Sequence, residues 1–215
     1  MKRFKVILAA AIAAATTSAF ATPTLVISDG STSTTLTSAS GIITFGSALD
    51  AFWNVVIVTG ETKPALGTAT KPQFDLNIQA SSAANAPNLT ITLSDNNFGP
   101  TTGTFVGKLS GSVGGGPGQN VSYSTFYDAG NVTSATTTPL TSTGSLAPPN
   151  YFPPNQLSGP FNQALYSLTQ VITIGGSANP SGLYNLDATL VVPEPGTFGL
   201  LLAGAAVFGV WRRRK

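Results

Sequence analysis

The 215-residue sequence contains no cysteine and no histidine. Without cysteine the chain can form neither disulfides nor a thiol nucleophile, so packing and hydrogen bonds must supply its stability. Without histidine it lacks the commonest general base, and the usual zinc ligands are missing as well. We therefore predict no metal site, no cofactor and no catalytic residues of these kinds.

Charged residues are also scarce, at 8% of the chain, whereas a typical soluble surface carries about 25–35%. The formal net charge of +2 comes from the two ends of the sequence. Between residues 22 and 192, three lysines (Lys63, Lys71 and Lys108) stand against seven acidic residues, so this body is acidic. It has no basic stripe, and we predict no nucleic-acid partner.

The first 21 residues have the order of a secretory signal peptide. A basic stretch at residues 2–5 precedes an apolar stretch at residues 6–15, which is too short to span a bilayer. Ala19 and Ala21 form an A-x-A cleavage site. Residues 1–21 therefore predict a signal-peptide helix that signal peptidase removes, with a retained signal anchor as the alternative.

The other end of the sequence has the order of a membrane anchor. Pro193, Glu194 and Pro195 lead into an apolar segment at residues 197–211. As a helix this segment would measure about 22 Å, against a hydrocarbon core of about 30 Å. The basic residues that follow are typical of a stop-transfer flank on the cytoplasmic side, and they are Arg212, Arg213, Arg214 and Lys215. A transmembrane helix that stays in the membrane is the plain interpretation.

The run from Val192 through Pro193-Glu194-Pro195 to Thr197, the apolar segment and the closing arginines together resemble the PEP-CTERM sorting signal of exported proteins of Gram-negative bacteria. The resemblance covers about residues 192–215, and we assign residues 191–215 as a sorting segment. It implies recognition by an exosortase, a membrane-embedded cysteine transpeptidase-like enzyme, with cleavage near Pro-Glu-Pro. The precursor would be held in the inner membrane before it reaches the cell surface or extracellular matrix.

The body has the alternation of β-strands. Apolar residues recur at every second position in residues 73–81 and 88–94, which predicts two half-buried strands paired across a turn at residues 83–87. Further strands are expected at residues 25–28, 42–45, 52–58, 104–109, 121–127, 165–174 and 183–192. No amphipathic helix is evident. We predict an all-β fold, a single β-sandwich or jelly-roll-like domain over residues 22–190, flanked by the two terminal helices.

Two body segments predict irregular structure. Residues 129–160 are rich in Thr, Ser and Pro, which favours a long extended loop packed on the domain, with a recognition loop as the alternative. Residues 95–97 (Asp-Asn-Asn) precede a Gly-Pro pair, which predicts an Asx turn rather than a calcium site. The Thr-rich residues 33–37 predict a solvated edge strand.

No motif places a nucleophile beside a base. Lys108 and Ser110 lie two positions apart, a spacing that arises easily by coincidence. The acidic residues are dispersed along the sequence, and a glycoside hydrolase would need folding to bring two of them together in a cleft. We therefore expect a non-enzymatic exported surface or matrix protein that associates with exopolysaccharide or the outer envelope. A carbohydrate-binding or adhesin module is the alternative, and a secreted hydrolase is the least favoured one.

These assignments make a prediction about processing. In a Gram-negative host with an exosortase, the mature protein should begin at Thr22 and end near Pro195, as measured by its intact mass. Glu194→Ala should leave the sorting segment attached, whereas Glu61→Ala in the body should not affect processing. An unchanged C-terminus in Glu194→Ala would mean that a generic protease, and not a motif-specific enzyme, cuts the chain.

Overall fold

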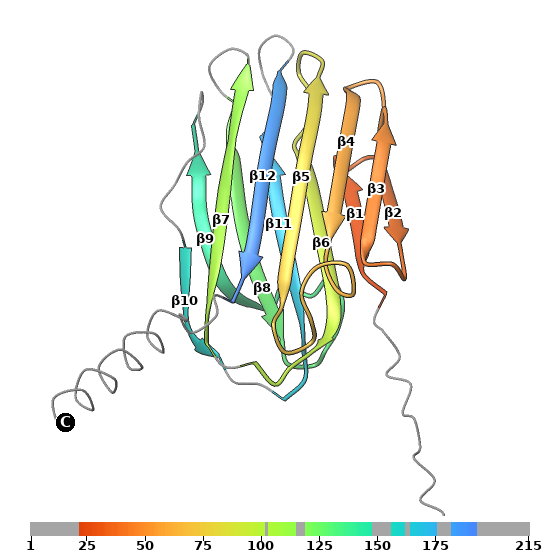
Figure 1. The fold of residues 1–215 in the computed structure, drawn as a ribbon. Coiled ribbons are helices and arrows are strands. Elements are labelled where there is room, and N and C mark those ends of the chain that lie inside the picture. The colour runs from red at the N-terminus through yellow and green to blue at the C-terminus, as the bar shows by residue number, and fades with distance from the viewer. Residues whose placement is uncertain are drawn as a thin grey trace, which may run out of the picture.

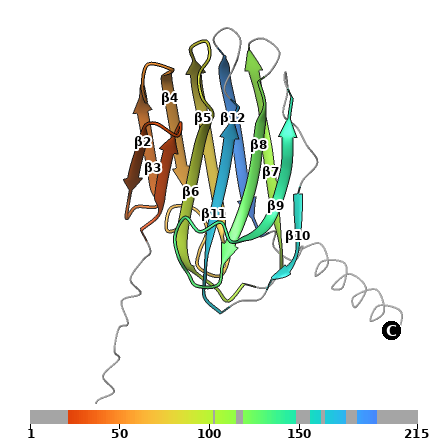
Figure 2. The same ribbon diagram turned by 180° about the vertical axis from the view of Figure 1, so that it is seen from behind.

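The computed structural model describes residues 22–101, 103–114, 119–147, 156–161, 164–175 and 182–192. The regular elements of these residues are β-strands arranged in two antiparallel six-stranded sheets (Figures 1 and 2), which confirms the predicted all-β class. The predicted signal peptide with Ala19 and Ala21, the Pro193–Pro195 motif and the basic tail lie outside the described residues. Within the described part, no helix has the length and apolar character that a membrane crossing requires.

The first sheet, sheet A, has the strand order β2-β1-β6-β11-β8-β9, and sheet B has the order β10-β7-β12-β5-β4-β3. The strands of sheet A are β1 (Thr24–Ser28), β2 (Ser33–Thr37), β6 (Leu89–Phe98), β8 (Val121–Asp128), β9 (Thr138–Leu146) and β11 (Tyr166–Ile174). Those of sheet B are β3 (Ile42–Ser47), β4 (Trp53–Glu61), β5 (Gln73–Ser82), β7 (Gly103–Gly114), β10 (Gln156–Phe161) and β12 (Leu183–Val191).

The two sheets face one another, and one apolar core fills the space between them (Figure 1). Each central strand contributes every second residue to this core, as in β12, where Leu186, Ala188 and Leu190 are buried and Asn185 and Asp187 are exposed. Large side chains close the core, and the largest fully buried ones include Trp53, Tyr123, Tyr166, Phe74, Phe98 and Phe105. Because successive side chains of a strand point to opposite faces of the sheet, the same strands supply both the apolar core and the polar outer faces.

The predicted pairing of residues 73–81 with residues 88–94 is wrong. β5 pairs with β4 and β12 in sheet B, whereas β6 pairs with β1 and β11 in sheet A. The connection between them carries the chain from one sheet to the other, and the Trp53 indole N–H anchors it by donating to the Pro87 carbonyl at 3.2 Å. The apolar faces of β5 and β6 thus meet across the core, where the Phe74 and Phe98 ring centroids lie 5.6 Å apart.

The predicted long loop at residues 129–160 is also wrong in part, because it contains β9 and β10. These are edge strands, β9 beside β8 in sheet A and β10 beside β7 in sheet B. Edge strands tolerate proline because one side of the backbone needs no partner, and Pro139 and Pro160 occupy such positions. The edge position of residues 33–37, by contrast, is confirmed in β2.

Residues 95–97 do not form the predicted turn, since β6 continues to Phe98. The register slips here: Leu168 of β11 lies opposite Asp95, but Tyr166 lies opposite Phe98. β6 therefore has one extra residue, and Asn97 takes a positive φ of 60°. The Asp-Asn-Asn run forms a β-bulge, which uses the same backbone freedom as a turn.

The core assignment predicts the effect of truncating one side chain of β5. Ile78 is 1% exposed, so Ile78→Ala should lower the free energy of unfolding by about 2–5 kcal/mol, because it leaves a cavity. Ile57 on β4 is the matched control, since its side chain faces outward and is 43% exposed. Ile57→Ala should cost at most about 1 kcal/mol. Urea denaturation of residues 22–192 measures both, and equal costs would contradict the assigned faces.

Candidate functional site

The outer face of sheet B carries two adjoining depressions that follow β12. The first has a volume of about 430 Å³ and is lined by Gln79, Ala80, Ser81, Ser112, Gly114, Leu183, Tyr184 and Asn185. The second has a volume of about 260 Å³ and is lined by Ser110, Gly111, Ser112, Asn185, Leu186 and Asp187. Because both include Ser112 and Asn185, we treat them as one surface feature, the β12 groove.

The groove is hollow because β7 carries small residues where it runs beside β12. Ser110, Ser112 and Gly114 alternate along its outer face and lie opposite Asp187, Asn185 and Leu183. At Gly111 the two strands approach so closely that a Cβ atom would lie 2.3 Å from the Asn185 carbonyl oxygen. Only glycine fits this position, and the resulting close contact fixes the register of the groove wall.

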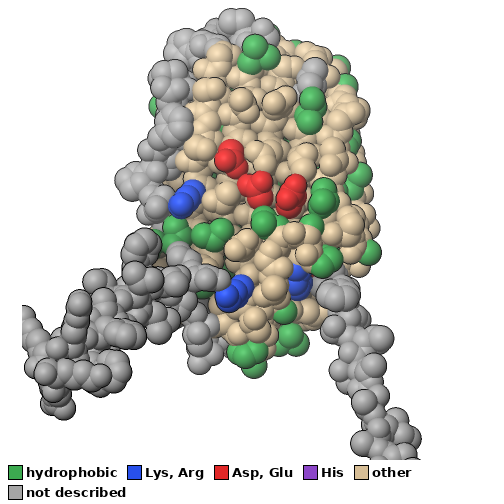
Figure 3. All heavy atoms as spheres, in the orientation of Figure 1, with side chains coloured by type: hydrophobic (Ala, Val, Ile, Leu, Met, Phe, Trp, Pro, Cys, Tyr) green, Lys and Arg blue, Asp and Glu red, His purple; other side chains and the backbone are tan. Residues whose placement is uncertain are grey.

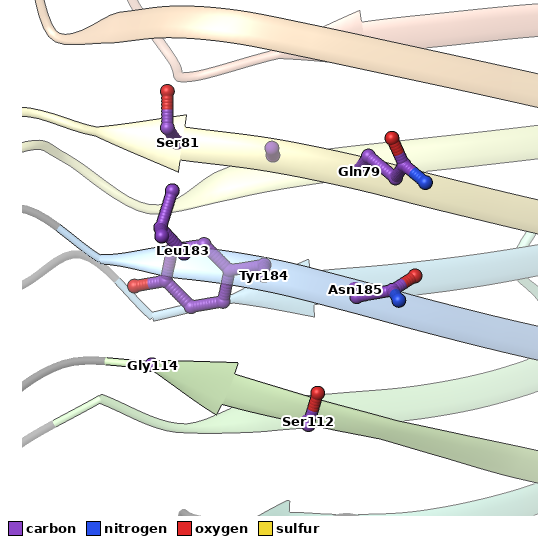
Figure 4. Close-up of a pocket in the computed structure, with 8 residues that line it drawn as sticks. Gln79, Ser81, Ser112, Gly114, Leu183, Tyr184 and Asn185 are labelled. Carbon is purple, nitrogen blue, oxygen red and sulfur yellow. The ribbon is translucent and has the colours of Figure 1, made fainter.

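A row of polar side chains crosses the middle of the groove. Asn185 lies between Gln79 of β5 and Ser112 of β7, as the register requires and as Figure 4 shows. At the start of β12, Leu183 adds an apolar side chain that is 65% exposed. Beneath them the Tyr184 ring points into the core and contacts Trp53, with ring centroids 5.7 Å apart. The floor is thus rigid, and the groove offers amide and hydroxyl groups beside an apolar contact.

Carboxylates gather at the other end of the groove. Asp187 lies opposite Asn77, and Asp75 lies opposite Glu61 in the neighbouring row; Figure 3 shows acidic side chains side by side near the middle of this face. The Asn77 amide donates to the Asp75 carboxylate at 2.7 Å. The side chain of Asp187 is exposed, but its carboxyl group is partly desolvated. This desolvation raises the pKa of Asp187, and the negative charge of Asp75 and a hydrogen bond with it raise this pKa further. Folding therefore brings two carboxyl groups into interaction.

The outer face of sheet A is chemically different. Its central positions are hydroxyl or small apolar side chains, with Thr92, Val171 and Ser124 adjacent in one row. Residues 129–137 fold over its lower part (Figure 2), where the Ser134 N–H donates to the Ser94 hydroxyl at 2.7 Å. The central rows of this face lack the amides that line the β12 groove, so the face serves as a comparison surface.

The structure gives Lys108 and Ser110 different neighbours, and it brings together two dispersed acidic residues, Asp75 and Asp187. Lys108 and Ser110 both lie on the outer face of β7, but the register places Lys108 beside Thr189 and Ser110 beside Asp187. The pairing of Asp75 with Asp187 was not predicted, because the two residues are far apart in the chain. Alternation in the sequence places both residues on the polar faces of their strands. It does not show that β5 and β12 are neighbours. No group of three or more metal-ligating residues occurs among the described residues.

Comparison with known protein families supports the interpretation of the C-terminal segment. Residues 191–215 match the PEP-CTERM protein-sorting motif, which confirms the resemblance. Among solved structures, the chain is similar to one titled "Structure of infectious bursal disease virus Gx strain", at 15% identity and a TM-score of 0.40. That match covers 82% of this chain, which spans 58% of the viral chain. No curated protein matches the sequence.

The interaction of Asp75 with Asp187 makes a prediction about ionisation. Asp75→Asn removes the charge that raises the pKa of Asp187, so this pKa should fall toward its ordinary value of 3.8. Glu61→Gln is the control and should leave the pKa of Asp187 unchanged. Carbon-13 NMR titration of the Asp187 carboxyl measures both shifts.

The sign of the effect on stability follows from the same pair. Because the folded pKa of Asp187 is raised, its contribution to stability is full below pH 3.8 and is lost as the pH rises through the folded pKa. Asp75→Asn should reduce this loss. An unchanged pKa of Asp187 in Asp75→Asn would show that the two carboxyl groups do not interact.

Proposed function

We propose that this chain, an exported protein with a PEP-CTERM sorting motif at residues 191–215, acts at the cell surface or in the extracellular matrix as a non-enzymatic β-sandwich that binds polysaccharide through the β12 groove. The motif accounts for export and for processing by an exosortase. The single observation that supports the binding role is the row of Gln79, Asn185 and Ser112 across an open groove.

The chemistry of the groove suits a hydroxyl-rich, non-acidic polymer. Amide and hydroxyl groups donate to and accept from sugar hydroxyls, and Leu183 offers an apolar contact to the C–H face of a sugar ring. Asp187 adds hydrogen-bond acceptors at one end of the groove, and its charge together with that of the neighbouring Asp75 disfavours polymers that carry carboxylates. We therefore assign neutral or amino-containing polysaccharides as the ligand class and exclude uronic-acid polymers.

The carboxyl pair also gives the hydrolase alternative a specific candidate, Asp75 with Asp187. Retaining glycosidases place their carboxyl groups about 5–5.5 Å apart, and inverting ones about 6.5–9.5 Å apart to admit a water molecule. Of this pair only Asp187 lines the groove, and the Asp75 carboxylate accepts a hydrogen bond from Asn77. This arrangement favours binding over glycoside hydrolysis, which needs both carboxyl groups in the cleft.

The test is binding of residues 22–192 to a panel of neutral, amino-containing and uronic-acid polysaccharides, measured by titration calorimetry. Asn185→Ala should weaken binding about five- to tenfold, because one net hydrogen bond is worth about 1 kcal/mol. Thr35→Ala, on the outer face of sheet A, should leave the affinity unchanged.

Equal loss in both variants, or binding of uronic-acid polymers alone, would contradict the proposal. The same samples should show no turnover of glycoside, ester or peptide substrates. Turnover that disappears in Asp187→Asn would instead establish the hydrolase alternative.

A further inference from the structure

A lysine and an aspartate meet inside the body at the junction of the two sheets. Lys63 follows β4 of sheet B, and Asp95 lies in β6 of sheet A. The Lys63 Nζ and Asp95 Oδ2 atoms are 2.7 Å apart, and the two side chains are 7% and 0% exposed. The Phe98 ring covers the amine from one side, with Nζ 4.0 Å from the ring centroid. Water is therefore excluded from an amine and a carboxyl group held in contact.

The carboxyl group is held by donors on both oxygens. The Asn96 backbone N–H donates to Asp95 Oδ1 at 2.8 Å, and the Thr62 hydroxyl donates to Oδ2 at 3.3 Å. The Asn96 carbonyl accepts a second N–H of Lys63, which restricts rotation of the amine. This arrangement fixes which carboxyl oxygen faces the amine and which one is bound by the backbone.

Burial favours the neutral form of both groups. It lowers the pKa of Lys63 and raises the pKa of Asp95, while the attraction between the two groups opposes both shifts. A neutral amine is a nucleophile and a neutral carboxylic acid is an electrophile, whereas the corresponding ions are neither.

We propose that Lys63 and Asp95 condense into an intramolecular isopeptide bond that covalently joins the two sheets. The Nζ lone pair forms a bond to Asp95 Cγ, and the bond from Cγ to Oδ2 breaks. Oδ2 leaves as water with its own proton and one proton from the amine, so no oxidant or other reactant is needed. The Asn96 N–H stabilises negative charge on Oδ1 as the bond forms, as an oxyanion-hole donor does, and the Thr62 hydroxyl lies where it can pass a proton to the leaving oxygen.

Such a bond fits a chain that cannot form disulfides. It would connect residues 32 positions apart and so restrict the unfolded chain, in the way a disulfide closes a loop. It would also replace a buried ion pair, whose desolvation offsets much of its attraction, by a neutral amide whose oxygen keeps the hydrogen bond from Asn96.

The experiment uses the full-length chain, purified, denatured and digested with a protease that cleaves before aspartate. Unlinked protein gives separate peptides 50–74 and 95–127. Linked protein gives peptide 50–74 joined to peptide 75–127, because the amide at Asp95 removes that cleavage site, and the joined mass is smaller than the sum by one water molecule. Mass spectrometry should find the joined species as the main product, and fragmentation should locate the bond at Lys63 and Asp95.

Two variants complete the test. Lys63→Arg should give the separate peptides, because the guanidinium group does not condense with a carboxyl group. Lys71→Arg changes an exposed lysine nearby and should still give the joined species. Separate peptides from the natural chain, or a joined species that persists in Lys63→Arg, would overturn the proposal. Lys63→Arg lacks the amine whether or not it folds, so its result does not depend on folding, whereas Lys71→Arg must fold before the bond can form and its fold is checked by circular dichroism.

Discussion

The rest of the structure depends on one constraint: β12 and its neighbours each have one apolar face in the core and one polar face toward solvent. Leu186, Ala188 and Leu190 are held between the sheets, so Asn185 and Asp187, between them in sequence, must face outward. The core and the groove are therefore opposite faces of one strand. A chain without cysteine relies on this packing, and the same packing holds the groove residues at fixed spacing for an incoming ligand.

The body has few charged residues, and four of them form two pairs in the structure. The buried contact of Lys63 with Asp95 joins the end of β4 to β6, while Asp187 lies at the end of the β12 groove and interacts with Asp75 beside it. Hydroxyl groups cover much of the remaining surface, as the rows of sheet A show. The acidic body thus has one hollowed face, where amides and a carboxylate line the groove, and one face whose central rows are rich in hydroxyl groups.

Alternation in the sequence predicted where most strands lie and which side chains are buried, because that pattern is local. It did not predict which strands are neighbours. Residues 73–81 and 88–94 show equal alternation whether they pair in one sheet or face each other across the core, so their pairing was assigned wrongly. For the same reason Asp75 and Asp187 were not recognised as a pair. The prolines of residues 129–160 led to the prediction of a loop where β9 and β10 occur. Proline is excluded from central strands but not from edge strands.

We propose above all that the outer face of sheet B is the binding face. Backbone amide NMR of residues 22–192, titrated with soluble oligosaccharides, tests it most directly. We expect the shifted resonances to lie in β5, β7 and β12, centred on Asn185. Shifts that gather instead on β6, β11 and β8, or no shifts at saturating neutral and amino-containing oligosaccharides, would contradict the claim.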